Sequence, residues 1–314
     1  MTNDTLMIEA LEARAQRRFE RRELFSFLTA AAATTGGLAL GSSPALAQAA
    51  PTDVDVLNFA LNLEYLEAQF YTFAVFGQGL PSGILGGTGT RGEATGGRRV
   101  NFTDPVVRQY AVEIAQDERA HVEFFRTALG SSAVAQPTID IGTAPNGAFS
   151  SAARAAGLIG AGQSFDPYAT DENFLLAAYI FEDVGVTAFK GASPLISNAT
   201  FLEAAAGILA VEAYHAGLIR TTLFQKGLQA PQLIDATEAI SNARDNLDGA
   251  SDVDQGIRPV GEASNIAPLD ANGLAYSRSA GQVLNIVYLN RMAVTQGGFF
   301  PAGVNGTIRT SAAS

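Results

Sequence analysis

Two short stretches decide how this chain folds: ERAH, from Glu118 to His121, and EAYH, from Glu212 to His215. They contain the only two histidines of the chain, and in each stretch a glutamate precedes the histidine by three residues. Residues three apart on an α-helix project from the same face, so each pair can hold a cation between its side chains. The spacing therefore predicts two helices that each carry part of a metal site.

The surrounding sequence predicts a bundle of four helices. Apolar residues recur with helical periodicity in four segments, at about residues 52–76, 104–129, 171–190 and 198–224. The Glu-x-x-His pairs lie on the apolar seams of the second and fourth segments. The first and third segments carry Glu64 and Glu182 on their seams, where an aliphatic residue is normally found. The pattern is typical of an all-α four-helix bundle whose interior is partly acidic.

One glutamate from each of two helices and a Glu-x-x-His pair from each of the other two form the pattern of di-iron and di-manganese bundles. Four buried carboxylates would repel one another, and two divalent cations would cancel their charge. Carboxylate and imidazole ligands favour two Fe or Mn ions, with Zn as an alternative. The competing interpretation is a bundle with buried polar pairs and no metal. The candidate metal ligands are Glu64, Glu118, His121, Glu182, Glu212 and His215.

Residues close to these ligands leave alternatives open. Glu67 follows Glu64 by three residues, so it could replace Glu64 as a ligand or add to it. Tyr71 could hydrogen-bond to a ligand or be an ordinary core tyrosine. Asp117 and Asp183 each lie next to a ligand, and they could orient the histidines or belong to a solvated face.

Composition narrows the possible functions. The chain has 314 residues, of which 47% are hydrophobic, so it can bury a large core and is not intrinsically disordered. It has no cysteine, which excludes disulfides, iron–sulfur clusters and thiol nucleophiles. Its net charge of −11 does not favour phosphate backbones, so nucleic acid is not an expected partner.

Residues 1–47 are predicted to be a signal peptide. Arginines, including Arg21 and Arg22, precede an uncharged run that ends in the small-residue pattern ALA at residues 45–47. The arginine pair resembles a twin-arginine export signal, which predicts the twin-arginine machinery as a partner and export of a folded chain. The expected location is periplasmic or extracellular, in a bacterial-type cell. The alternative is an N-terminal membrane anchor.

The mature chain is expected to contain two parts. Residues 52–228 form the bundle, and residues 229–314 form a C-terminal extension that packs on it. The glycine-rich stretch at residues 78–103 is too polar to be a core element. Shorter helices are expected near residues 151–158, 235–247 and 280–289, and the aromatic tail at residues 297–301 is expected to pack back on the bundle.

The sequence resembles the ferritin-like superfamily. Glu64 with Tyr71 seven residues later is similar to the first helix of bacterioferritins and manganese catalases. The stretches NFALNLEYLEA (residues 58–68) and GGFFP (residues 297–301) are similar to an exported ferritin-like family that includes plant desiccation-related proteins. The resemblance covers roughly residues 52–228 and implies a di-metal bundle.

A site of this kind implies chemistry with O2 or peroxide, in a ferroxidase- or catalase-like protein that protects against stress or desiccation. Two alternatives remain: a non-enzymatic, metal-stabilised bundle that protects envelope components during drying, and an iron store. The glycine-rich first loop and the C-terminal region depart from compact ferritins, which argues against a large storage cage. Whether the chain forms a homo-oligomer is left open.

Overall fold

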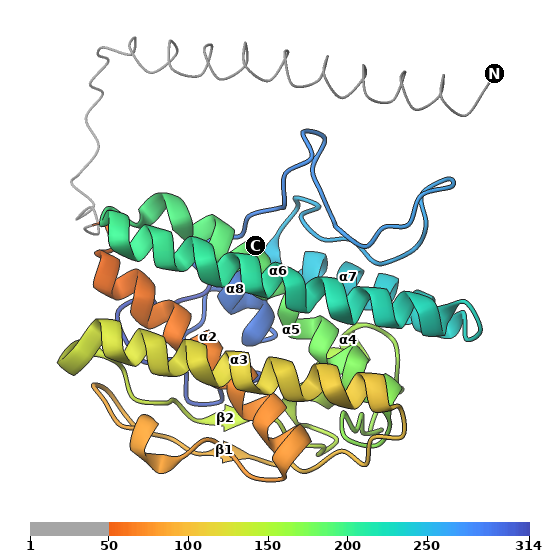
Figure 1. Ribbon diagram of the computed structural model, residues 1–314, viewed down its shortest axis with the longest axis horizontal. Helices are drawn as coiled ribbons and strands as arrows, with labels where there is room; N and C mark the ends of the chain where they lie inside the picture. Colours follow the sequence, from red (N-terminus) through yellow and green to blue (C-terminus); the bar gives the residue numbers. More distant parts are fainter. Residues whose placement is uncertain (1–49) are drawn as a thin grey trace. The chain divides into compact units, whose positions relative to one another are not determined.

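The computed structural model describes residues 50–314, and the predicted signal peptide at residues 1–47 lies outside this range. Each end of the four long helices lies within three residues of the predicted segment, and the prediction of an all-α bundle is confirmed. The long helices, shown in Figure 1, are α2 (Asp53–Phe76), α3 (Pro105–Leu129), α5 (Asp171–Ala192) and α6 (Ala199–Gly227).

Side-chain caps define where these helices begin. Thr52 and Asp55 form a reciprocal capping box at the start of α2. Asp104 accepts hydrogen bonds from two backbone N–H groups at the start of α3, where Pro105 occupies the first helical position. Thr170 and Asn198 cap α5 and α6 in the same manner. These caps satisfy backbone N–H groups that would otherwise lack hydrogen-bond partners, and so they fix the residue at which each helix begins.

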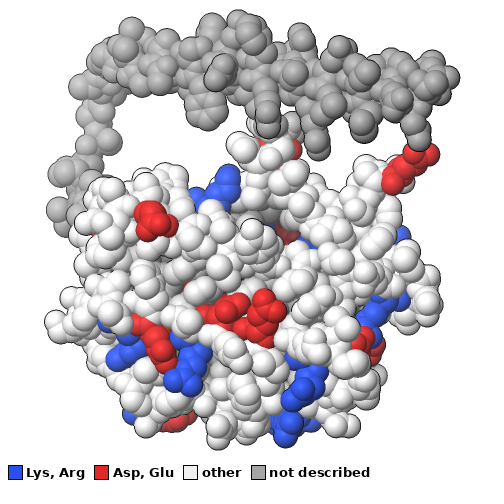
Figure 2. Space-filling model, viewed as in Figure 1, with Lys and Arg blue, Asp and Glu red and all other residues white. Residues whose placement is uncertain are grey.

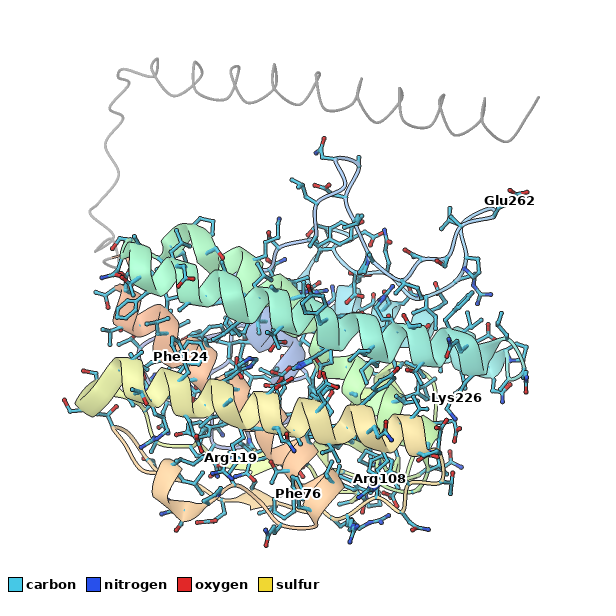
Figure 3. All side chains as sticks on the ribbon, viewed as in Figure 1. Phe76, Arg108, Arg119, Phe124, Lys226 and Glu262 are labelled. Atoms are coloured by element: carbon cyan, nitrogen blue, oxygen red, sulfur yellow. The ribbon has the colours of Figure 1, made fainter. Side chains whose placement is uncertain are left out.

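The helices pack as two antiparallel hairpins, α2 with α3 and α5 with α6. Ion pairs and hydrogen bonds at the helix ends align the two hairpins. Lys226, labelled near the end of α6 in Figure 3, contacts Asp104 at the start of α3 and Glu172 at the start of α5. At the opposite end, Asp53 accepts a hydrogen bond from the backbone N–H of Asn198. The midpoints of all four helices therefore lie at one level.

The glycine-rich first loop is more ordered than its composition suggests, so the expectation that it contributes no core element is wrong. Leu80, Leu85 and Val100 are buried. The loop also contains a short strand, β1 (Ala94–Thr95), that pairs in parallel with β2 (Ile139–Asp140) from the second long connection. The remaining elements are η2 (Ser82–Ile84), η3 (Gly130–Ser132), α4 (Ala148–Ala155), η4 (Ser193–Leu195), α7 (Gln232–Asp248) and α8 (Ala280–Val287).

The C-terminal residues pack against the bundle through aromatic rings. Phe299 is fully buried and makes edge contacts with Phe149 of α4 and Phe181 of α5. Phe70 of α2 joins the same cluster and contacts both Phe149 and Phe181. Rings from three helices and the C-terminal tail therefore share one core.

A buried network of arginines and aspartates joins the C-terminal extension to α5. Asp183 of α5 pairs with Arg220 at 2.8 Å and with Arg244 of α7 at 3.1 Å. Asp254 accepts from Arg244 and, at 3.0 Å, from Arg278. Because all of these groups are almost fully buried, each charge depends on its partners to remain in the core.

Within the described range, α6 is the one helix long and apolar enough to cross a membrane. Its buried face carries Glu212, His215 and Arg220 against the other helices, an arrangement typical of a core helix in a bundle.

Candidate metal centre

The six predicted ligands all point into the middle of the bundle. They come from α2, α3, α5 and α6, the four helices whose midpoints the terminal contacts bring to one level. None of the six side chains lies on the outer surface. The exposed fractions are 0% for Glu64, Glu118 and Glu212, 1% for Glu182, 2% for His215 and 8% for His121.

The six side chains form two overlapping groups, within each of which the candidate ligand atoms lie no more than 4.8 Å apart. The first ligand group is Glu64, Glu118, His121 and Glu212, and the second ligand group is Glu118, Glu182 and His215. Glu118 belongs to both, so its carboxylate lies between two candidate ion positions. This is the place of a bridging ligand.

Both histidines face the carboxylates through Nδ1. In the first ligand group, His121 Nδ1 lies 3.2 Å from Glu64 Oε2 and 3.6 Å from Glu118 Oε2. In the second ligand group, His215 Nδ1 lies 3.0 Å from Glu118 Oε1 and 3.7 Å from Glu182 Oε2. The two oxygens of Glu118 are therefore divided between the two histidines.

The hydrogen-bonding of these groups fits metal ions. Buried oxygens on all four glutamates lack a hydrogen-bond partner among the described residues, and so does Nδ1 of His215. Buried polar atoms without hydrogen-bond partners lower the stability of the fold, and here these atoms lie together in the two ligand groups. Four carboxylates and two imidazoles are the donor set that iron and manganese pairs take in helical bundles. The residues present therefore fit two such ions.

The electrostatics of the metal-free site place positive charge on the histidines. Burial disfavours an imidazolium, but the Glu64 and Glu118 carboxylates outweigh it and raise the pKa of His121 to about 11. Burial also lowers the pKa of His215, but Glu118 and Glu182 outweigh this effect and raise the pKa of His215 to about 9. Burial alone would raise the pKa of Glu118, but the two imidazoles that face it hold that pKa well below its usual value.

The other carboxyls shift in the opposite direction. Burial raises the pKa of Glu64 to about 8 and that of Glu182 to about 7. Burial, followed by repulsion from Glu118, raises the pKa of Glu212 well above its usual range. The metal-free centre thus holds several protons near neutral pH, and cations that bind there must displace them.

These shifts predict how stability depends on pH. The raised pKa values mean that the folded metal-free protein holds more protons than the unfolded chain, so its free energy of unfolding falls as pH rises from about 5 to about 9. We expect metal-free protein to unfold at a lower temperature at about pH 9 than at about pH 6. Added Mn²⁺ should stabilise more strongly at the higher pH, because it binds deprotonated ligands. Thermal unfolding with and without Mn²⁺ measures both effects, and an unfolding temperature of metal-free protein that rises with pH would contradict this assignment.

The structure shows what each of the neighbouring residues contacts. Tyr71 donates a hydrogen bond to Oε1 of Glu182, so it contacts a candidate ligand. Asp117 lies 3.2 Å from Nε2 of His215 and can hold that ring with Nδ1 toward the centre. Asp183 instead belongs to the arginine network. Glu67 is buried and lies outside both ligand groups, whereas Glu64 belongs to the first ligand group.

An open cleft between α3 and α6 leads toward the second ligand group. Its volume is about 560 Å³, and its walls include Glu113, Asp117, Tyr214 and His215. Figure 2 shows acidic atoms gathered on this face, between the two helices as oriented in Figure 1. The Asp117 side chain is 41% exposed and contacts His215, so a candidate ligand lies at the wall of the cleft.

One residue that shapes the centre was missed in the sequence analysis. Gly185 lies in the interior of α5, one turn after Glu182, and the carboxylate of Glu212 occupies the space where a side chain would be. The available signal was a glycine inside an otherwise strongly apolar helical segment, where glycine is unfavourable unless something needs the space.

Comparisons with known proteins agree with this geometry. The ferritin-like domain family matches residues 52–225. The desiccation-related protein PCC13-62 of Craterostigma plantagineum is 29% identical over 81% of this chain and 83% of its own length. The ferritin-like catalase Nec2 of Nesocodon mauritianus is 27% identical over 82% of this chain and 84% of its own length. No solved structure matches the chain significantly.

Proposed function

The chain belongs to the ferritin-like domain family, and from this premise we propose that it holds two iron or manganese ions and disproportionates hydrogen peroxide. The observation that carries the proposal is the position of Glu118 in both ligand groups, because a shared carboxylate keeps two ions adjacent. The similarity to a protein named as a ferritin-like catalase supports peroxide as the substrate.

Peroxide disproportionation converts two H2O2 molecules into one O2 and two H2O, so two electrons pass from one peroxide to the other. Two bound ions that each change oxidation state by one unit would supply that capacity. The chain's own residues hold the ligands in place. Tyr71 hydrogen-bonds to Glu182, and Asp117 contacts the outer nitrogen of His215. The cleft between α3 and α6 gives a molecule as small as peroxide a short approach to this side of the centre.

The test is oxygen release from hydrogen peroxide by protein loaded with Mn²⁺ or Fe²⁺. We expect turnover by the loaded protein, none after chelation, and a loss of roughly 100-fold or more in His215→Ala, because removal of a ligand disrupts the second ion position. Arg119→Ala is the matched control, since Arg119 lies inside the ERAH stretch but points outward and pairs with Glu123. Loaded protein that binds two ions without releasing oxygen would contradict the reaction.

A second candidate is a protective, non-enzymatic bundle, favoured by the similarity to a desiccation-related protein. In that case the ions stabilise the fold and catalyse no reaction. Oxygen release separates the two functions, because both require bound metal and only one consumes peroxide.

We also propose that the protein acts outside the cytoplasm after export by the twin-arginine machinery. The proposal depends on the arginine pair at Arg21 and Arg22 and on the small-residue pattern at residues 45–47. Export of a folded chain would allow metal to be loaded before export. Replacing both arginines with lysine should retain the chain in the cytoplasm, as fractionation would detect.

A further inference from the structure

A pocket separate from the metal centre lies between α5, α6 and the connection from α7 to α8. Its volume is about 190 Å³. Val186 of α5 and Ala216 of α6 line one part of it, and residues 266–269 of the connection, which runs beside α6 in Figure 1, line another. The six candidate metal ligands lie outside this lining, so the pocket, which we call the apolar pocket, is a second site.

The lining of the apolar pocket offers mainly hydrophobic contact. Most of it consists of aliphatic side chains, proline and glycine. One of these side chains, Leu269, is 43% exposed, so a molecule bound beside it would remove apolar surface from water. The polar residues of the lining are Asp183, Thr187, Arg220, Asp254, Tyr276 and Arg278.

The charged residues of the lining are engaged with one another and with the backbone. Nε of Arg220 donates to the carbonyl of Ile266 at 2.6 Å, and Nη1 donates to Asp183 at 2.8 Å. Nη2 of the same residue donates to the carbonyl of Asn265 at 2.7 Å. Arg278 likewise donates from Nε, Nη1 and Nη2. A charged ligand would therefore have to displace pairs that the protein already makes.

Hydrogen bonds also hold the walls of the apolar pocket apart. Tyr276 donates from its hydroxyl to the backbone carbonyl of Leu269 at 3.0 Å. Arg220 holds the carbonyl of Ile266. Both ends of the segment at residues 266–269 are thus fixed to the rest of the protein. The pocket is therefore largely formed before a ligand arrives, as binding sites for small molecules usually are.

Size and polarity define the ligand. A dry apolar cavity of about 150 Å³ takes benzene, and water stays in a cavity only where several polar groups are free to hold it. A helix of a partner protein, about 10 Å across, is too wide for this volume. We propose that the apolar pocket binds an uncharged, apolar small molecule of the size of a substituted benzene ring.

The first experiment titrates the full chain with toluene in a calorimeter. We expect saturable binding with a negative change in heat capacity, because apolar surface leaves water. Benzoate has the same ring and a negative charge, and it should bind at least about tenfold more weakly, since the arginines of the lining are engaged. Absence of toluene binding, or benzoate that binds as tightly as toluene, overturns the inference.

The second experiment fills the apolar pocket. Ala275 lines it, so the larger side chain in Ala275→Leu should weaken toluene binding by about tenfold or more, with an unchanged circular dichroism spectrum. Ala271→Leu is the matched control, because Ala271 is exposed on the same connection and lies outside the lining, and it should bind toluene as the wild type does. Wild-type affinity in Ala275→Leu overturns the assignment of toluene to this pocket.

A third variant removes part of the wall without adding volume. Leu269→Ala should fold, because Leu269 is partly exposed, and it should bind toluene more weakly than the wild type, because it loses apolar contact. Wild-type affinity in this variant also contradicts the pocket as the site.

The inference stands apart from the proposed function. Protein that binds toluene but no metal contradicts the metal centre and leaves the apolar pocket standing. Protein that binds two metal ions but no toluene overturns only the apolar pocket.

Discussion

Replacing Glu118 with alanine is expected to empty the metal centre completely. Among the described residues, Glu118 is the one member common to both ligand groups, and its two oxygens face His121 and His215. Without it, each candidate ion position loses a carboxylate and the two imidazoles lose the group that lies between them. The stabilisation by bound ions should disappear as well, about 2.7 kcal/mol at a free metal concentration 100 times the dissociation constant.

Elemental analysis and thermal unfolding with and without added metal measure this effect. Glu182→Ala should behave differently, because Glu182 belongs only to the second ligand group and the first would remain. Glu123→Ala is the matched control on α3, where Glu123 is exposed and pairs with Arg119. Full metal content in Glu118→Ala would contradict the bridging position.

Replacing Arg244 with alanine is expected to cause the largest loss of stability outside the centre, about 3–5 kcal/mol in the free energy of unfolding. Arg244 is almost fully buried and bridges two aspartates, Asp183 of α5 and Asp254 of the C-terminal extension. It also donates a hydrogen bond to the backbone carbonyl of Tyr179 at 2.7 Å. Its removal leaves buried negative charge with fewer partners and loosens the contact between α5 and the extension, which includes α7.

Urea unfolding monitored by circular dichroism measures this loss. Arg258→Ala is the control, because Arg258 and its partner Asp235 are exposed and solvent screens such a pair. We expect little or no change there. If Arg244→Ala were as stable as Arg258→Ala, the buried network would not be what fastens the extension to the bundle.

The long helices and the buried positions of the candidate ligands could be predicted because they depend on local patterns. A helix of 3.6 residues per turn places residues three or four apart on one face, so an acidic residue on an apolar seam is visible in the sequence. The unusual pairing of Glu118 with His121 and of Glu212 with His215 then identified the second and fourth helices.

The remaining features depend on contacts between distant segments. The pairing of β1 with β2 joins two loops of irregular sequence, and neither strand is long enough to show alternation. Arg220, Arg244 and Arg278 look like surface residues in the sequence, since nothing local shows that buried aspartates receive them in the core. The division of roles between Asp117 and Asp183 likewise depends on which helix each one faces.

Crystallography with anomalous scattering at the iron and manganese absorption edges tests the central claim most directly. Metal-loaded protein should show two peaks on either side of the Glu118 carboxylate, one beside Glu64 and His121 and the other beside Glu182 and His215. Their separation should be about 3.5–4 Å, as in other two-metal sites. Absence of both peaks, or a single peak away from Glu118, would contradict the account.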